Sequence, residues 1–372
     1  MHKILNALGL LALCAALVAP PANAEIDPAA LPIRHLNVAA ADESALNGIL
    51  HSHAHLMAAQ TPAGSVARAL GLLDDAPRPA LQAHGNPTSG NFFFGPASMI
   101  CLGNVRGGAG SSGCQVIKAA EQHPIYVNTP ATAVAANFGN PAQFITDYSA
   151  SNFSHIDDQY IYAPNPDTGA PGVGANNRYP LATSYFITYK PHQTLQESDV
   201  FAIVHAAAVA AKVTKSSGLE HIFHVFIPKG TDTCYTATAC YSPADPKTFA
   251  FCGYHSEVTF SDIGTVLFTV EPYQGVKGCA IPVGYADNVS GQPTASNDLL
   301  FSAASVLAHE ITETITDPLL TTGWRAEYTG PESGQEIGDI CVGQWAGTVM
   351  NGHTWITQML YSNYYYACGN GT

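Results

Sequence analysis

Short apolar and β-branched runs bounded by Gly, Pro or Asp recur along the chain, a pattern that predicts β-strands. Five of them are Ile125 to Asn128, Ser184 to Tyr189, His221 to Ile227, Phe249 to Phe260 and Thr265 to Val270. Two longer segments predict largely buried helices, Ser198 to Lys215 before Gly218 and Asn297 to Thr316 before Pro318. Strands followed by a long helix and a loop-rich tail indicate an α+β fold, in which a mixed sheet packs on the second helix.

The chain divides into three parts by composition. Residues 1–24 combine Lys3, an apolar run and the small-residue end Ala22-Asn23-Ala24, the pattern of a secretory signal peptide. Residues 25–95 have little periodicity, so we expect a pro-segment or a flexible N-terminal arm. Its tract His51-Ser-His53-Ala-His55 is interpreted as solvated histidines without a fixed role, with weak metal capture as the alternative. Residues 96–372 are expected to form one globular domain.

Acidic residues outnumber basic ones by two to one. The 372 residues include 28 Asp and Glu against 14 Lys and Arg, which gives a formal net charge of -14. Because this charge repels phosphate backbones and anionic lipid, we expect neither nucleic acid nor a membrane surface as a partner. No run of about 20 apolar residues follows the leader, so no spanning helix is expected. Together with the leader, this predicts a secreted protein, extracellular or periplasmic.

The number of cysteines that follow the leader is even. Eight of them follow the leader: Cys101, Cys114, Cys234, Cys240, Cys252, Cys279, Cys341 and Cys368. In an oxidising compartment an even set predicts up to four disulfides that staple loops, and pairing of sequence neighbours is the simplest of about 105 connectivities. The absence of Cys-x-x-Cys spacing argues against a cysteine zinc site.

The strongest chemical signal is His309-Glu310-Ile-Thr-Glu313, inside the second predicted helix. It resembles the His-Glu-x-x-His pattern of zinc hydrolases, with Glu313 in place of the second histidine. Residues i and i+4 share a helix face, so His309 and Glu313 are predicted to bind one divalent cation, with Glu310 as the general base for metal-bound water. The alternative is a solvated helix face that carries the motif by chance. The small and apolar segment 302–307 instead favours burial, and a buried motif requires a cation or a dense hydrogen-bond network.

Two downstream carboxylates are candidates to complete the site. Glu336 follows Glu313 by 23 residues, and Asp339 comes three residues later. In thermolysin-like peptidases a later glutamate is the third ligand and an aspartate orients the first histidine, so Glu336 is predicted as a ligand and Asp339 as its hydrogen-bonding partner. Asp317 competes for the third place, since i+8 returns to nearly the same helix face as His309.

Two further histidines and the identity of the metal stay open. His255 is an alternative ligand, and His353 is a candidate to stabilise the oxyanion. One imidazole with two carboxylates largely neutralises a divalent ion. Zinc is therefore the expected cofactor, but Mn²⁺, Fe²⁺ or Ca²⁺ would also suit so oxygen-rich a set.

The C-terminal third resembles a known family. The matching segments are Cys252-Gly-Tyr-His255, Ala308-His-Glu-Ile-Thr-Glu313, Asp317-Pro-Leu, Gly323-Trp324, Glu336-Ile-Gly-Asp-Ile-Cys341 and the apolar stretch closing at Cys368. They resemble the exordium, or phosphate-induced, proteins of plants and a wider group of secreted bacterial and fungal proteins. The plant members are extracellular, and the bacterial relatives look like zincin-type metallopeptidases.

The resemblance and the motif together predict a zincin-like domain and a secreted, metal-dependent peptidase that acts on protein or peptide substrates. The resemblance implies the same assignments as the motif: His309, Glu313 and Glu336 are ligands, Glu310 is the base, and Asp339 hydrogen-bonds to a ligand without binding the metal. The alternative is a non-catalytic, exordium-like extracellular protein that contacts the cell wall or a protein partner.

Overall fold

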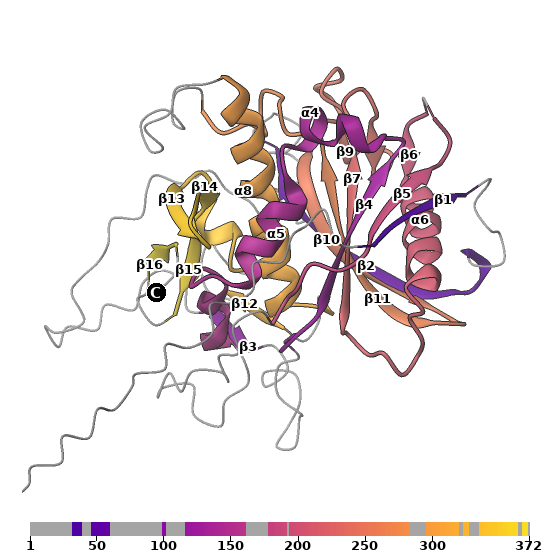
Figure 1. The fold of residues 1–372 in the computed structure, drawn as a ribbon, viewed down its shortest axis with the longest axis horizontal. Helices are drawn as coiled ribbons and strands as arrows, with labels where there is room; N and C mark the ends of the chain where they lie inside the picture. Colours follow the sequence, from indigo (N-terminus) through magenta and orange to yellow (C-terminus); the bar gives the residue numbers. More distant parts are fainter. Residues whose placement is uncertain are drawn as a thin grey trace, which may run out of the picture.

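The protein is α+β and is built on one mixed, seven-stranded sheet (Figure 1). The computed structural model describes residues 32–38, 46–59, 99–101, 116–160, 178–191, 193–282, 295–319, 323–326, 335–363 and 367–370. The expected signal peptide, residues 1–24, lies outside these ranges. None of the helices in the described ranges is both long and apolar enough to cross a membrane.

The central sheet has the strand order β1-β5-β4-β7-β11-β10-β2. In that order its strands are Ile33–Asn37, Ser184–Thr188, Glu121–Val127, His221–Ile227, Gly264–Pro272, Phe251–Phe260 and Ile49–Ala58. Neighbours from β1 to β11 are parallel, whereas β11, β10 and β2 pair antiparallel. Each of the five predicted strands is present, with ends shifted by a few residues at most.

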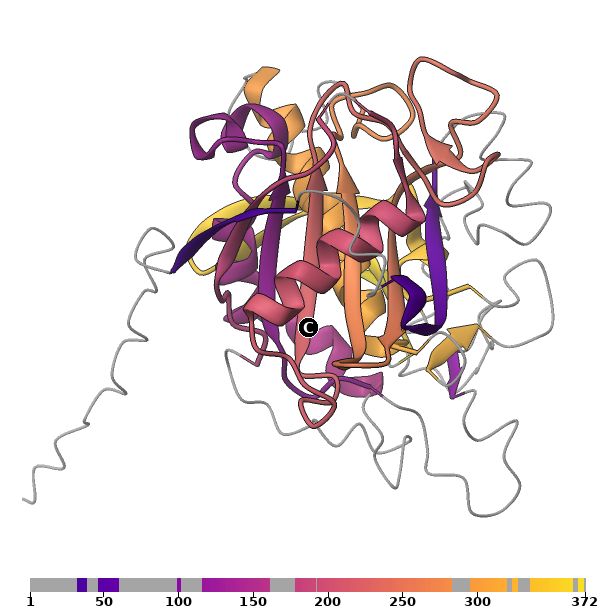
Figure 2. The same cartoon turned by 90° about the vertical axis from the view of Figure 1, so that its right-hand side faces the viewer.

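Helices cover both faces of this sheet. α6, Glu197–Ala210, lies across one face (Figure 2), and α8, Ala295–Thr316, packs on the other together with α5, Pro141–Ser149. Because side chains alternate along a strand, Tyr254 of β10 joins the core under α6 while His255 points to the α8 side. α6 begins with a reciprocal capping box between Gln196 and Asp199.

A C-terminal layer covers the far side of α8, seen as yellow strands in Figure 1. It consists of the hairpin of β13 and β14, Trp345–Met350 and His353–Gln358, and the pair of β15 and β16, Leu360–Ser362 and Ala367–Gly369. The remaining elements are short: β3 Met99–Cys101, η3 Ala131–Ala133, α4 Val134–Phe138, η4 Ser154–Tyr160, β6 Leu195–Gln196, β8 Thr233–Cys234, β9 Cys240–Tyr241, β12 Trp324–Ala326 and η6 Asp339–Cys341. α8 is therefore enclosed between the sheet and this layer.

Three disulfides join sequence neighbours, as predicted. Cys234–Cys240, Cys252–Cys279 and Cys341–Cys368 have S–S distances of 2.00, 2.05 and 2.03 Å. The fourth expected pair involves Cys114 and the Cys101 side chain, which lie outside the described residues. Disulfides persist in oxidising compartments, so these pairs point to such a compartment for this chain.

The prediction of a flexible arm over residues 25–95 is wrong for two stretches. β1 pairs with β5 at one edge of the sheet, and β2 pairs with β10 at the other. The strand was not predicted because the alternating positions in the middle of β2 are histidines instead of apolar residues. Since both edges of the sheet come from this segment, the globular fold does not begin at residue 96.

Candidate metal centre

A cluster of buried histidines and carboxylates lies where α8 meets β10, β2 and the loop that leads into η6. Its members are at most 4% exposed: His55, His255, His309, Glu310, Glu313, Glu336 and Asp339. Three of them come from α8, one each from β2 and β10, and two from the 336–339 segment. The tertiary fold thus brings four distant parts of the chain to one buried polar point.

The α8 part of the cluster matches the predicted geometry. His309 Nε2 lies 3.0 Å from Glu313 Oε2, one helical turn away. The other oxygen of Glu313, Oε1, accepts the backbone N–H groups of Gly338 and Asp339 at 3.0 and 3.2 Å. A Cβ on Gly338 would lie 2.5 Å from His309 Nδ1, so only glycine permits this approach of the loop. Glu313 is thereby fixed with one oxygen turned toward His309.

His55 lies on β2, the edge strand beside β10, and contacts the cluster from there. Its Nδ1 lies 2.5 Å from Glu336 Oε1, and its Nε2 lies 2.9 Å from Asp339 Oδ2. Directly across the strand pair, His255 Nε2 lies 2.9 Å from Glu336 Oε2 and 3.8 Å from Glu313 Oε2. The two imidazole rings stack with their centroids 5.6 Å apart. Two histidines therefore hold Glu336 from one side.

Three overlapping groups within this cluster have ligand atoms within 4.8 Å of one another. They are His309, Glu310 and Glu313; His55, Glu313 and Asp339; and His55, His255 and Glu336. The predicted trio of His309, Glu313 and Glu336 is not one of these groups in the described part of the chain. Asp339 has a ligand atom within 4.8 Å of those of His55 and Glu313, so it lies among the candidate ligands and is not only a hydrogen-bonding partner of Glu336. His255 contacts Glu336, in agreement with its prediction as an alternative ligand.

Several buried polar atoms make no hydrogen bond within the described ranges: both carboxylate oxygens of Glu310, and Oε2 of Glu313 and Nε2 of His309, which lie 3.0 Å apart without hydrogen-bond geometry. Leaving such atoms buried without a partner costs about 1–3 kcal/mol each, and more when the group is charged. A divalent cation would satisfy several of them at once, because carboxylate oxygen and imidazole nitrogen are its ordinary ligands. These residues therefore fit a bound cation.

The charge balance of the cluster favours a cation as well. Glu271, Glu310, Glu313, Asp317, Glu336 and Asp339 are each at most 2% exposed. Arg325 contributes one guanidinium, paired with Asp317 and Glu336 at 2.7 and 2.8 Å. Buried like charges of this number cannot all ionise unless further positive charge is present.

The pKa values divide these carboxyls into two kinds. Burial, reinforced by the neighbouring carboxylates, raises the pKa of Glu310 and of Glu313 well above the usual range. Burial likewise raises the pKa of Glu271 to about 8. Burial would also raise the pKa of Glu336, but His55, His255 and Arg325 together hold it below its usual range. In the metal-free protein these shifts favour the ionised form of Glu336 and the protonated forms of Glu310 and Glu313.

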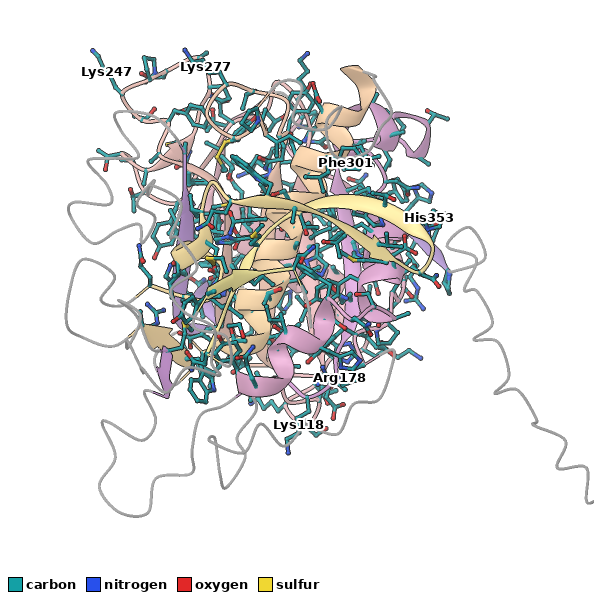
Figure 3. The ribbon with its side chains drawn as sticks, turned by 90° about the vertical axis from the view of Figure 1, so that its left-hand side faces the viewer. Lys118, Arg178, Lys247, Lys277, Phe301 and His353 are labelled. Carbon is teal, nitrogen blue, oxygen red and sulfur yellow. A yellow bond between two sulfur atoms is a disulfide. The ribbon has the colours of Figure 1, made fainter. Side chains whose placement is uncertain are left out.

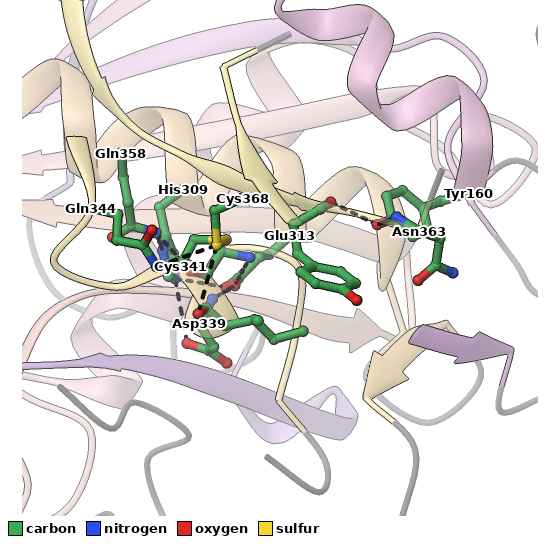
Figure 4. The surroundings of a disulfide bond; sticks show 12 residues. Tyr160, His309, Glu313, Asp339, Cys341, Gln344, Gln358, Asn363 and Cys368 are labelled. Atoms are coloured by element: carbon green, nitrogen blue, oxygen red, sulfur yellow. Dashed lines mark hydrogen bonds and ion pairs between the residues drawn. A yellow bond between two sulfur atoms is a disulfide. The ribbon is translucent and has the colours of Figure 1, made fainter. Parts of the chain in front are cut away.

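Gln358 of β14 sets the orientation of the His309 ring (Figure 4). The Gln358 amide nitrogen donates to Gly338 O at 2.7 Å and lies 2.9 Å from His309 Nδ1. Donation to Nδ1 leaves the ring proton on Nε2. For ligation through Nε2, the ring proton must instead be on Nδ1. The Gln358 amide is then turned so that its Oε1 accepts this proton; that oxygen makes no hydrogen bond within the described residues.

Two predicted residues have other positions. Asp317 accepts hydrogen bonds from Gly323 N–H at 3.0 Å and from Arg325, so it anchors the guanidinium and is not placed as a third ligand. His353 hydrogen-bonds Asp147 of α5 at 2.9 Å and lies at the outer edge of the C-terminal layer (Figure 3). Five residues of strand separate His353 from Gln358, about 16 Å, so the structure does not place His353 to stabilise an oxyanion at the cluster.

The sequence interpretation missed His55, Gln358 and Arg325. Alternating histidines in 51–55 were a signal of strand periodicity that could have identified His55. Gln358 and Arg325 carried no such signal, because their contacts with His309, Asp317 and Glu336 depend on how the loops fold and not on a periodic pattern.

Comparison with family models, with curated proteins and with solved structures gives no match for this chain. The likeness to exordium proteins therefore rests on the quoted segments alone.

Proposed function

We propose that the cluster binds one divalent cation and that the protein is an exported, zincin-like metallopeptidase with Glu310 as its general base. The observation that supports this proposal most directly is a set of buried α8 atoms that make no hydrogen bond to any described residue: both oxygens of Glu310, one oxygen of Glu313 and one nitrogen of His309. The signal-like leader and the disulfides support export.

Glu313 and His55 are the central ligands in this proposal, because each belongs to two of the three groups of converging ligand atoms. His309 contacts Glu313 at 3.0 Å within α8, and the ligand atoms of His55, Glu313 and Asp339 lie within 4.8 Å of one another. The nitrogen and oxygen donors suit zinc, and the high share of carboxylates would also suit Mn²⁺ or Fe²⁺.

Each side chain then has a separate task. A bound cation supplies Lewis acidity that makes water a nucleophile near neutral pH. Glu310, beside the ligand atoms, accepts the proton of the attacking water and returns it to the leaving amine. Gly253 of β10 makes room for that carboxylate, since a Cβ there would lie 2.8 Å from Glu310 Oε1. Arg325 keeps Glu336 ionised for the two histidines that face it.

A second candidate function is a structural ion in a non-catalytic extracellular protein that contacts the cell wall or a protein partner. Burial favours it, because His309, Glu310, Glu313, Glu336 and Asp339 are all 0% exposed. A peptide substrate would require an opening beside α8, whereas a structural ion would not.

One pair of measurements separates the two candidates. Elemental analysis of the mature secreted protein is combined with cleavage of an unstructured protein substrate, with and without a chelator. Metal bound at the cluster together with chelator-sensitive cleavage that Glu310→Gln abolishes is the expected result. Retained metal without cleavage in the wild type would instead establish the structural ion.

The matched control is His205→Ala, which breaks an ion pair with Asp262 outside the cluster and should change neither metal content nor cleavage. Undiminished cleavage by the Glu310→Gln variant would overturn the assignment of the base.

A further inference from the structure

A second set of metal-ligating side chains lies on the other face of the sheet, at the amino ends of two parallel strands. Glu121 and His123 are residues 1 and 3 of β4, so they share a face, and His221 is the first residue of β7 and pairs with Glu121. The rings of Tyr185 and Phe223, which belong to the core under α6, contact His123. This trio is therefore separated from the α8 cluster by the sheet itself.

The three ligand atoms converge on one point. His123 Nε2 lies 3.0 Å from His221 Nδ1, and Glu121 Oε2 lies 3.5 and 3.6 Å from these two nitrogens. Zinc binds nitrogen and oxygen at about 2.0–2.2 Å, so two ligand atoms of a tetrahedral site are about 3.4 Å apart. The observed triangle is close to one face of such a tetrahedron.

The His123 ring is already oriented for ligation. Its Nδ1 lies 3.2 Å from the carbonyl oxygen of Thr183, to which it can donate its proton. Donation there leaves the lone pair of Nε2 directed at the trio, as in zinc sites whose ligating histidine donates its other N–H to a carbonyl. The ring of Phe223 stacks on His123 with centroids 4.8 Å apart and limits its rotation.

The exposure of the three side chains differs in a way that suits an open site. The His123 side chain is 3% exposed, that of His221 19% and that of Glu121 57%. The buried His123 is thus held in place by its surroundings, whereas Glu121 reaches solvent, where a water molecule can take the fourth position.

We propose that Glu121, His123 and His221 form a second divalent-cation site, of two histidines and one glutamate, that is open to solvent and binds zinc. The proposal does not depend on the function assigned to the α8 cluster. Its competitor is a hydrogen-bonded histidine pair without metal, in which His221 donates to His123.

The test is the number of zinc ions bound per chain. Metal-depleted full-length mature protein is dialysed against micromolar Zn²⁺ at neutral pH, and zinc is measured by mass spectrometry for the wild type and for His221→Ala. The variant should bind one zinc ion fewer than the wild type, whatever the occupancy of the α8 cluster. Glu121→Gln, an exposed and sterically conservative change, should weaken zinc binding at this site by about tenfold or more, because even the loss of a residue that only supports a ligand costs about 10- to 100-fold.

His205→Ala again serves as the control, because it removes an imidazole near the same α6 face without touching the trio. Equal zinc content and equal affinity in His221→Ala and the wild type would overturn the proposal. A far-ultraviolet circular dichroism spectrum unchanged from the wild type ensures that a loss of zinc reports the site and not unfolding.

Discussion

His55 Nε2 lies 2.9 Å from Asp339 Oδ2, although 284 residues separate the two along the chain. The contact ties an edge strand near the N-terminus to the loop that enters η6. It makes the integrity of the proposed metal centre depend on the correct pairing of β2 with β10. Four predictions follow from this cluster and its surroundings.

Replacing His55 with alanine should weaken metal binding and destabilise the metal-free protein. The change removes the partner of both Glu336 and Asp339, and breaking a buried ion pair costs about 3–5 kcal/mol. Metal content by elemental analysis and the free energy of unfolding in urea are the measurements. His35→Ala, an exposed histidine on β1, should leave both unchanged. An unaltered metal content in His55→Ala would remove His55 from the ligand set.

Gly338→Ala should reduce metal affinity about 10- to 100-fold, as expected for the loss of a residue that supports ligands. The added Cβ would lie 2.5 Å from His309 Nδ1 and 2.8 Å from Glu313 Oε1, so one of these side chains must move. A chelator-competition titration measures the affinity. Gly352→Asn, in the open turn between β13 and β14, should have no such effect. Wild-type affinity in Gly338→Ala would indicate that the loop adapts without disturbing the ligands.

The metal-free protein should lose stability as the pH rises from about 4.5 to about 8. The pKa of Glu271 is about 8 in the fold against 4.5 as its ordinary value, so the folded state binds more protons over this window. When the folded state binds more protons, the free energy of unfolding falls with rising pH. Urea unfolding at several pH values, with chelator present, should show this slope, and Glu271→Gln should flatten it. An equal slope in the variant would contradict the assignment to Glu271.

Removing the Cys341–Cys368 disulfide should destabilise the protein by about 3 kcal/mol, the range for a loop of this length. Figure 4 shows this bond beside His309, Glu313 and Asp339, so the double variant Cys341→Ala/Cys368→Ala should also bind metal more weakly. Thermal unfolding and chelator competition measure the two effects. Loss of Cys234–Cys240, outside the cluster, should destabilise without changing metal affinity. Equal metal affinity in both double variants would show that the Cys341–Cys368 disulfide does not support metal binding.

Much of the local structure could be predicted from the sequence. The helix with His309 and Glu313 on one face follows from a periodicity that spans few residues, and burial of that helix follows from the small and apolar residues before the motif. Disulfides between sequence neighbours also follow, because short loops close at low entropic cost.

Other parts of the centre could not be predicted. The place of His55 depends on an antiparallel pairing with β10 across about 200 residues, which no local pattern in β2 indicates. The separation of His353 from the cluster depends on which end of β14 faces α8. The convergence of Glu121, His123 and His221 depends on the parallel register of β4 and β7.

The sequence by itself predicted the helix around the motif, the shared helix face of His309 and Glu313, and the pairing of neighbouring cysteines that three disulfides confirm. Those features depend on spacing within a helix turn or a short loop. Only the tertiary structure decided that His55 joins the cluster, that Asp339 lies beside His55 and Glu313, that Arg325 anchors Asp317 and Glu336, and that a second histidine group forms at the start of β4 and β7. Strand order and register are set by the burial of whole sheet faces, a free energy summed over distant residues that no local pattern records.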